Sequence, residues 1–269
     1  MVKDITLGQY IPGNSLIHRA DPRVKLILTF ILMTTIMIVK SYTAFLMIAG
    51  LILVTVFSGK IPFVYTLKGL KPIMPVVIFT ALINIFTTEG TVLYGFKFIH
   101  ITYEGLDMAA KTSLRIVTLI IGTSIMLLTT TPLSLTDGIE RLLYPLSRIG
   151  LPVHKFAMMM NIALRFIPTL LEETDKVMKA QASRGVDFET GGIIERGKNF
   201  IPVLVPLFVS ALRRADELAV AMEARCYNGG KGRTRMKQLK LTKVDLQITL
   251  VLVVFEFVLL YVQYVKMPV

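Results

Sequence analysis

Apolar stretches that are long enough, or nearly long enough, to cross a lipid bilayer constrain this chain more than any other feature. A helix needs roughly 20 mostly apolar residues to cross about 30 Å of hydrocarbon. Five stretches approach or meet that length, and we expect each to span the membrane: 24–39, 42–57, 73–86, 114–130 and 244–265. The third is the shortest and has prolines at its start, where proline is tolerated. The sequence therefore predicts an all-α integral membrane protein with about five transmembrane helices.

The charges of the chain gather in particular segments between these stretches. Hydrophobic residues make up 54% of the 269 residues, yet the formal net charge is +12. Residues 132–243 carry 18 Lys and Arg against 11 Asp and Glu, which accounts for +7 of that charge. Because basic residues mark the cytoplasmic side of a membrane protein, we expect the N-terminus and 132–243 to be cytoplasmic and the C-terminus to be external.

The hydrophobicity pattern divides the chain into three zones. Residues 1–131 form an N-terminal segment with a four-span membrane unit, 132–243 form a polar and amphipathic cytoplasmic region, and 244–269 return through the bilayer. Within the first zone, 91–103 alternate apolar and polar residues around a glycine, which predicts a short external hairpin with a structural role. The basic run 231–243 directly precedes the last span, so we expect it to contact anionic lipid rather than nucleic acid.

The residues that catalysis or cofactor binding would require are missing from the pattern. The three histidines lie on separate segments and predict no metal cluster, and residues 229–232 lack the spacing of a phosphate-binding loop. We therefore expect no cofactor and no enzymatic activity. Glu256 lies inside the last span, where a carboxylate is a candidate for transport, although contact with a neighbouring helix or with Gln263 is more usual. A self-contained secondary carrier or channel is thus the alternative function.

Residues 132–243 contain two to three amphipathic helices. After a break at 131–134, Ser134 or Thr136 is expected to cap a helix that reaches about Arg148. A long helix then runs from about Val153 towards Ser183 and ends at a glycine suited to the left-handed position. Its apolar residues, three and four apart, form one face: Phe156, Met159, Met160, Ala163, Phe166, Ile167 and Leu170. A second helix is expected over about 201–225, after a glycine-containing linker at 189–197.

Both of these long helices end in an arginine between small residues. The first ends in Ala182, Ser183, Arg184 and Gly185, and the second, 41 residues later, ends in Ala224, Arg225 and Cys226. The helix dipole favours a cation in the last turn, and a guanidinium that projects there can make paired bonds to carboxylates or carbonyls of a partner. Two such tips suit a partner with two similar lobes.

Taken together, these motifs resemble those of the CbiQ-like transmembrane T components of energy-coupling factor (ECF) transporters. The resemblance covers nearly the whole chain. It rests on the opening 9–15 and 18–25, on 213–219 leading to 221–225, and on Ala-Arg-Gly motifs that match 182–185 and 224–226. In those two motifs Ser183 stands where alanine is usual, and Cys226 stands where glycine is usual.

The resemblance implies a fold, a function and partners. Membrane helices would carry crossed cytoplasmic coupling helices in the plasma membrane of a prokaryote, as the energy-coupling scaffold of a vitamin or micronutrient importer. Arg184 and Arg225 would dock into two similar or identical ABC ATPase subunits, which themselves bind ATP and Mg²⁺. A separate membrane-embedded S component would bind the substrate and would contact the apolar face from Phe156 to Leu170, where methionines suit a surface that accepts several partners.

Overall fold

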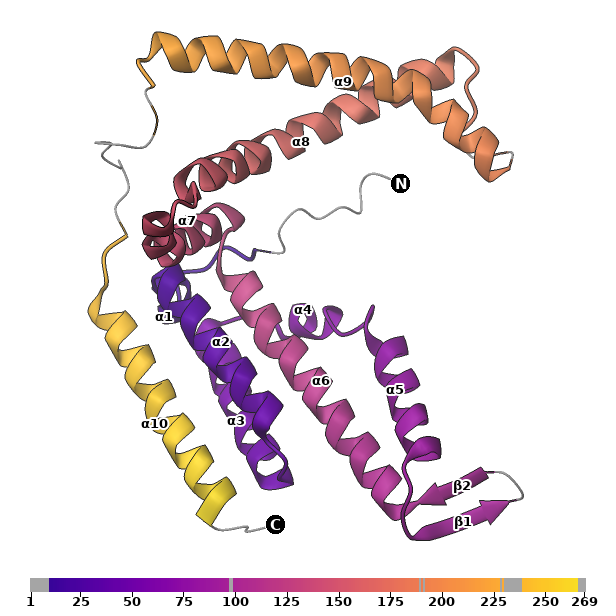
Figure 1. The fold of residues 1–269 in the computed structure, drawn as a ribbon, viewed down its shortest axis with the longest axis vertical. Coiled ribbons are helices and arrows are strands. Elements are labelled where there is room, and N and C mark those ends of the chain that lie inside the picture. The colour runs from indigo at the N-terminus through magenta and orange to yellow at the C-terminus, as the bar shows by residue number, and fades with distance from the viewer. Residues whose placement is uncertain are drawn as a thin grey trace. The chain divides into compact units, whose positions relative to one another are not determined.

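The computed structural model describes residues 10–96, 99–188, 190, 192–227, 229 and 239–265. The chain divides into two compact units, and the division falls within helix α7 (Pro132–Leu143). The first, called the membrane unit here, comprises residues 8–139 and 238–269. The second comprises residues 140–237 with 1–7 and is called the α8–α9 unit after its two long helices (Figure 1). Some residues named in the sequence analysis lie outside the described part of the chain. They are Gln9, residues 231–238 of the basic run, and the last four residues.

The membrane unit contains seven of the described helices, so the predicted all-α class is confirmed. They are α1 (Leu16–Arg19), α2 (Pro22–Ile38), α3 (Tyr42–Gly59), α4 (Phe63–Lys68), α5 (Met74–Thr87), α6 (Tyr103–Thr129) and α10 (Lys243–Val265). Three of the five expected spans, α3, α6 and α10, are long and apolar enough to cross a membrane. The helices at the other two expected positions are shorter, with 17 residues in α2 and 14 in α5.

Helix α6 begins 11 residues before the stretch expected to span the membrane. The added residues, 103–113, include the charged side chains of Glu104, Asp107 and Lys111. The Thr102 hydroxyl caps the helix by accepting a hydrogen bond from the Gly105 N–H at 3.1 Å. One turn on, Asp107 and Lys111 form an i,i+4 ion pair at 2.7 Å, so the polar residues support a helix here.

The hairpin expected at 91–103 is present. Strands β1 (Val92–Phe96) and β2 (Ile99–Thr102) pair antiparallel, with an irregularity between Val92 and Tyr94. Glu104, which follows the second strand, binds the residue before the first strand, because its carboxylate accepts a hydrogen bond from the N–H of Thr91 at 2.7 Å. The hairpin packs on α5 and α6.

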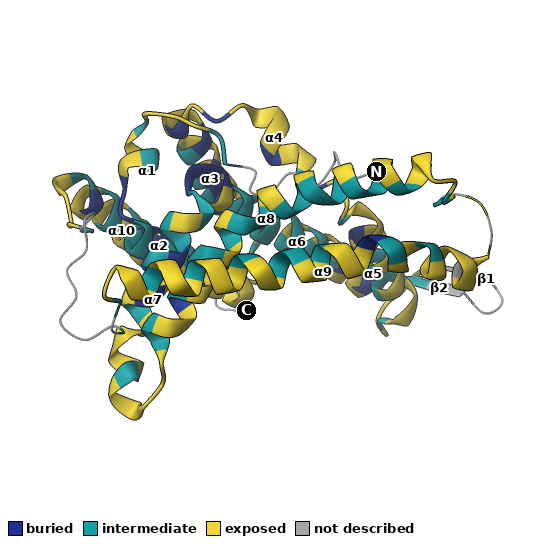
Figure 2. Ribbon diagram, turned by 90° about the horizontal axis from the view of Figure 1, so that it is seen from above, coloured by how far each residue is buried: buried dark blue, intermediate teal, exposed yellow. Residues whose placement is uncertain are grey.

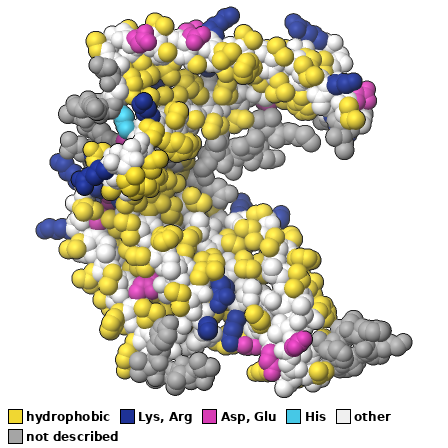
Figure 3. Space-filling model, in the orientation of Figure 1, with side chains coloured by type: hydrophobic (Ala, Val, Ile, Leu, Met, Phe, Trp, Pro, Cys, Tyr) yellow, Lys and Arg dark blue, Asp and Glu magenta, His cyan; other side chains and the backbone are white. Residues whose placement is uncertain are grey.

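A buried core and an apolar outer surface make the membrane unit suited to lipid. Ile36, Ile48, Leu128 and Leu259 are at most 1% exposed and belong to one cluster. Figure 2 shows buried segments, in dark blue, on α3. Much of the visible outer surface is also hydrophobic (Figure 3). Its most exposed large side chains, each over 70% exposed, include Phe30, Leu46, Phe57 and Phe257. Such a surface fits a membrane and not water.

Polar side chains tie the helix ends of the membrane unit together. Asp21 caps α2 through its Oδ1, which accepts from the N–H of Arg23 at 2.9 Å, and Pro22 takes the first helical position, as expected for the entry to the first apolar helix. The Asp21 N–H in turn donates to Oδ1 of Asp245 in the first turn of α10, at 2.6 Å. At the far end of α6, the Lys25 ammonium donates to the Thr129 carbonyl at 2.9 Å. These bonds satisfy backbone groups that a helix end leaves without partners.

Glu256 of α10 contacts a neighbouring helix of the membrane unit. Its Oε2 accepts a hydrogen bond from the Thr35 hydroxyl of α2 at 2.7 Å, and both residues are buried. Gln263, the other partner considered for this carboxyl, donates instead to the Ile38 carbonyl at 3.3 Å. Glu256 therefore joins α10 to α2.

The helix predicted to reach Arg148 ends earlier. Helix α7 ends at Leu143 and is followed by a 3₁₀ helix, η2 (Tyr144–Ile149). Pro145 has no N–H to give to a carbonyl in the preceding turn, so the α-helix does not continue. The cap also differs from the prediction, because the Thr131 hydroxyl accepts from the Ser134 N–H at 3.3 Å.

Candidate docking site on helices α8 and α9

Helices α8 (Val153–Ser183) and α9 (Ile193–Ala224), together with the turns that directly follow them, carry the residues predicted to contact the ATPase subunits and the S component. The bounds expected for α8 are confirmed, and the helix continues through Pro168. The linker expected at 189–197 is wrong in part, because α9 already begins at Ile193 and continues through Pro202 and Pro206. The two helices pack on each other.

A side chain from α8 replaces one of the helical hydrogen bonds that the prolines of α9 remove. In a regular helix the carbonyl of Pro202 would accept a hydrogen bond from the N–H of residue 206, and Pro206 has none. The side-chain Nε2 of Gln181, in the last turn of α8, donates to that carbonyl at 3.3 Å. The interhelical contact thus supplies the donor that the local sequence lacks.

Both helices end in the same hydrogen-bonded motif. In α8, the N–H of Gly185 donates to the Ala182 carbonyl at 3.0 Å, and that of Val186 donates to the Gln181 carbonyl at 3.1 Å. In α9, the corresponding bonds run from Cys226 to Glu223 at 2.8 Å and from Tyr227 to Met222 at 3.0 Å. This pair of bonds defines a Schellman C-cap. The two ends are thus built alike, although their sequences differ.

The Schellman motif needs a left-handed residue immediately after its C-cap, and the two tips fill that place differently. Gly185 has φ +89° and Cys226 has φ +59°. Glycine adopts this conformation freely, whereas a side chain makes it costly. Cys226 therefore takes the left-handed position at the α9 end that Gly185 takes at the α8 end.

Arg184 and Arg225 hold the C-cap position of the two motifs, with φ close to −90° in both. Both arginines are exposed. Within the described part of the chain, neither guanidinium makes a hydrogen bond or an ion pair. Each is therefore available to carboxylates or carbonyls of another molecule.

The apolar face predicted on α8 separates into two parts in the structure. Phe156, Met159, Met160 and Ala163 are exposed, whereas the residues nearer the middle of the helix, Phe166, Ile167 and Leu170, are half-buried. Phe166 and Leu170 turn toward α9. The exposed part is therefore the portion of the predicted face that is free to meet a partner.

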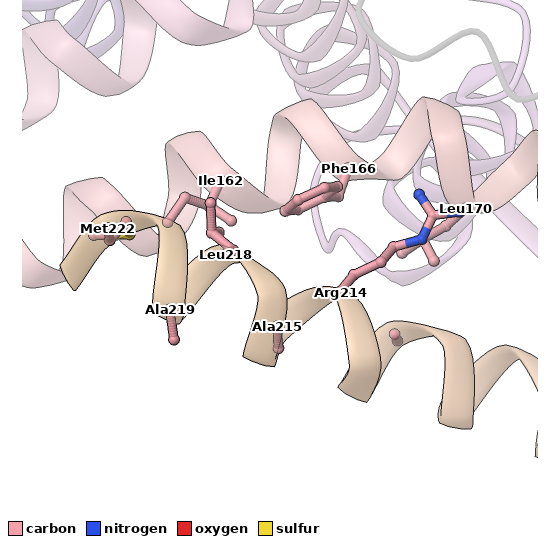
Figure 4. Close-up of a pocket in the computed structure, with 9 residues that line it drawn as sticks. Ile162, Phe166, Leu170, Arg214, Ala215, Leu218, Ala219 and Met222 are labelled. Carbon is pink, nitrogen blue, oxygen red and sulfur yellow. The ribbon is translucent and has the colours of Figure 1, made fainter. Parts of the chain in front are cut away.

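An apolar groove lies between α8 and α9, with a cavity volume of about 270 Å³ (Figure 4). The α8 wall is bulky and the α9 wall includes three alanines four residues apart. The lining residues are Ile162, Phe166, Leu170, Ala211, Arg214, Ala215, Leu218, Ala219 and Met222. Arg214 is the only charged residue among them, and Figure 4 shows it reaching toward α8 beside Leu170.

A polar cluster between the two helices was not anticipated. Glu173 of α8 accepts from the Ser210 hydroxyl at 2.6 Å and from the Arg214 guanidinium at 2.7 Å. Ser210 and Arg214 lie one turn apart on α9, so a single carboxylate binds both. That i,i+4 spacing of polar residues beside apolar ones was the available signal, but the position of Glu173 opposite them depends on how the helices pack.

Comparisons with known proteins identify the family of the chain. The sequence model of the family CbiQ, described as cobalt transport protein, matches residues 13–236. A protein of Ruminiclostridium cellulolyticum named "Energy-coupling factor transporter transmembrane protein EcfT" is 57% identical over 265 residues, which cover 98% of this chain and 99% of the relative. Proteins with the same name from Clostridium kluyveri and Bacillus subtilis are 56% and 46% identical, and the matches cover 91% and 98% of this chain and 92% and 100% of the relatives. The chain therefore belongs to the CbiQ family, among the membrane-embedded transmembrane components of energy-coupling factor transporters.

Proposed function

We propose that this chain is the non-catalytic energy-coupling subunit of an ECF-type importer of a vitamin or another micronutrient. It links ATP hydrolysis in two ABC ATPase subunits, which bind ATP and Mg²⁺, to a membrane-embedded S component that binds the substrate. The α8–α9 unit and the N-terminus then face the cytoplasm, where ATP is available, and the C-terminus is external.

The observation that carries the proposal is the equivalence of the two helix tips. Arg184 and Arg225 are both exposed C-cap residues of helices with the same Schellman ending. Two projections with the same backbone ending fit two similar or identical subunits, each with one groove. Ala182 and Ser183 flank the first arginine, and Ala224 flanks the second, so small side chains leave room for a groove wall. Each charge-assisted bond contributes about 1.5–3 kcal/mol.

The S component is proposed to rest on the exposed part of the α8 face. Phe156, Met159, Met160 and Ala163 offer flexible, apolar side chains there, and methionines adapt to partners of different shape. Exposed apolar residues of α9, among them Val205, Phe208 and Leu212, add to the apolar surface that α8 and α9 offer. Movement of α8 and α9 when the ATPases close around ATP would reorient or release the S component.

The alternative of a self-contained carrier has less support. It requires Glu256 to exchange a proton or an ion, but the carboxylate is buried and accepts the Thr35 hydroxyl. That contact gives Glu256 a structural role within the membrane unit.

The test is a detergent pull-down of the full chain co-expressed with the two ATPases and the S component of the same organism. The double variant Arg184→Glu, Arg225→Glu should lose the ATPase subunits, because two favourable charges become repulsive. The matched control, Lys176→Glu with Arg213→Glu, changes the same number of exposed charges on the same two helices and should retain them. Equal ATPase retention in both double variants would contradict the proposal.

A further inference from the structure

The contacts between α8 and α9 are arranged in a definite antiparallel register. Glu173 binds Ser210, and Gln181, eight residues further along α8, binds Pro202, eight residues back along α9. At a rise of 1.5 Å per residue, these two contacts are about 12 Å apart along the helices. Directional polar bonds therefore hold the two helices in one register over this segment.

The packing changes character beyond Glu173, towards the start of α8. There the helices meet beside the apolar groove, where Ile162 and Phe166 of α8 line a cavity of about 270 Å³ together with Leu218 of α9 (Figure 4). Apolar contacts are not directional, and a cavity leaves room for neighbouring side chains to move. One end of the helix pair is thus fixed by hydrogen bonds, and the other end is loosely packed.

The two tips lie at opposite ends of this arrangement. Arg184 follows Gln181 by three residues, so it belongs to the fixed end. Arg225 follows Met222, which lines the groove, by three residues, so it belongs to the loosely packed end. A change in the angle between α8 and α9 about the fixed segment would therefore alter the distance between the two arginines.

We infer that Glu173, through Ser210 and Arg214, is a positioning residue that sets the α8–α9 angle and so fixes the Arg184–Arg225 spacing. This inference rests on the proposed function, because the spacing matters only if two ATPase subunits must be met at once. The side chains of Glu173 and Arg214 are 24% and 34% exposed, so water does not fully surround the pair. Glu173 is thus the point about which the angle between α8 and α9 can change, and the groove leaves room for that change.

The test measures the distance between the helices directly in the full chain. Spin labels are placed at Lys179→Cys and Val220→Cys, both exposed and away from the arginines, after the native cysteine is removed as Cys226→Gly. Glu173→Ala removes the carboxylate that binds Ser210 and Arg214, so it should broaden the distribution of distances between the spin labels. Double electron–electron resonance measures this distribution. The neighbouring, exposed Glu172 provides the matched control, and Glu172→Ala should leave the distribution unchanged.

The unlabelled variants are then tested in the complex with the ATPases and the S component. Glu173→Ala should still bind both ATPases, but substrate uptake per ATP hydrolysed should fall by about three- to tenfold, a usual range for residues that modulate coupling between sites. Exchanging the charges, as Glu173→Arg with Arg214→Glu, should restore a narrow distance distribution and uptake. Such a rescue would show that the defect of Glu173→Ala comes from the lost ion pair and not from misfolding.

Two results would overturn the inference: a Glu173→Ala distribution as narrow as that of Glu172→Ala, or full coupling in Glu173→Ala. Either result leaves the proposed function intact if Arg184→Glu with Arg225→Glu still releases the ATPases. Conversely, retention of the ATPases by that arginine variant contradicts the proposed function, whatever the distance measurement finds.

Discussion

Arg184 and Arg225 occupy the same C-cap position of two Schellman-terminated helices, and the residue after each has positive φ. The α8 tip has glycine at this left-handed position, whereas the α9 tip has Cys226. A side chain in the left-handed region costs about 1–2 kcal/mol. The two equivalent tips should therefore differ in how readily they open.

Cys226→Gly should stabilise the α9 tip, because glycine adopts φ +59° without steric cost. A gain of about 1 kcal/mol corresponds to roughly fivefold slower exchange of the amides of residue 226 and Tyr227. Hydrogen–deuterium exchange of the full chain in detergent measures this local opening. Cys226→Ala keeps the steric cost and should exchange like the unmodified chain, and Gly185→Ala should speed exchange at the α8 tip. Equal protection in the glycine and alanine variants at 226 would contradict the explanation.

Gln181→Leu should destabilise the start of α9 by about 1 kcal/mol, because the Pro202 carbonyl loses its donor. The same substitution should have little effect in a Pro206→Ala background, since the new N–H of residue 206 can bond to that carbonyl within the helix. Amide exchange over 199–206 in the four variants gives the interaction as a double-mutant cycle. An equal cost of Gln181→Leu in both backgrounds would show that Gln181 does not act through this carbonyl.

The elements that could be predicted from the sequence are those that local patterns determine. The apolar residues at three- and four-residue spacing identified α8 as an amphipathic helix, Gly185 marked its end, and alternation around a glycine predicted the hairpin of β1 and β2. Gly185 at positive φ was predictable because glycine is the residue that best tolerates it. The membrane-embedded class followed from long apolar runs, which hydrogen-bond their own backbone as helices in lipid.

The features that could not be predicted depend on contacts between distant segments. Pro202 and Pro206 favour an end to a helix, and α9 continues through them with Gln181 of another helix as the donor to the Pro202 carbonyl. Glu173 looks like any polar residue of an amphipathic helix until α9 places Arg214 opposite it. The left-handed conformation of Cys226 could be expected only from its place in the resembling motif, where glycine is usual, because a cysteine is itself disfavoured there.

The stability of the α2 start should depend on acid pH through Asp21. Burial raises the pKa of this carboxyl, but the hydrogen bonds and the charge of Arg23 outweigh that effect and hold the pKa below 3.8. Because the folded-state pKa is depressed, the contribution of the carboxylate is fully present above the unfolded-state pKa and is lost as pH falls through the folded-state value. Thermal unfolding in detergent between about pH 5 and pH 3 should show a smaller loss of stability for Asp21→Asn. An identical slope in both proteins would rule out Asp21 as the titrating group.

Thr35→Val should destabilise the membrane unit by about 1–3 kcal/mol, because it leaves the buried Glu256 carboxyl without the Thr35 hydroxyl as donor. In a Glu256→Leu background the same substitution should be nearly neutral, since both polar partners are then absent. Thermal unfolding of the four variants in detergent measures this difference. Glu256→Gln keeps an acceptor for the Thr35 hydroxyl, so both stability and substrate uptake by the assembled importer should be preserved. Loss of uptake in a stable Glu256→Gln protein would instead favour a carrier in which this carboxyl takes part in transport.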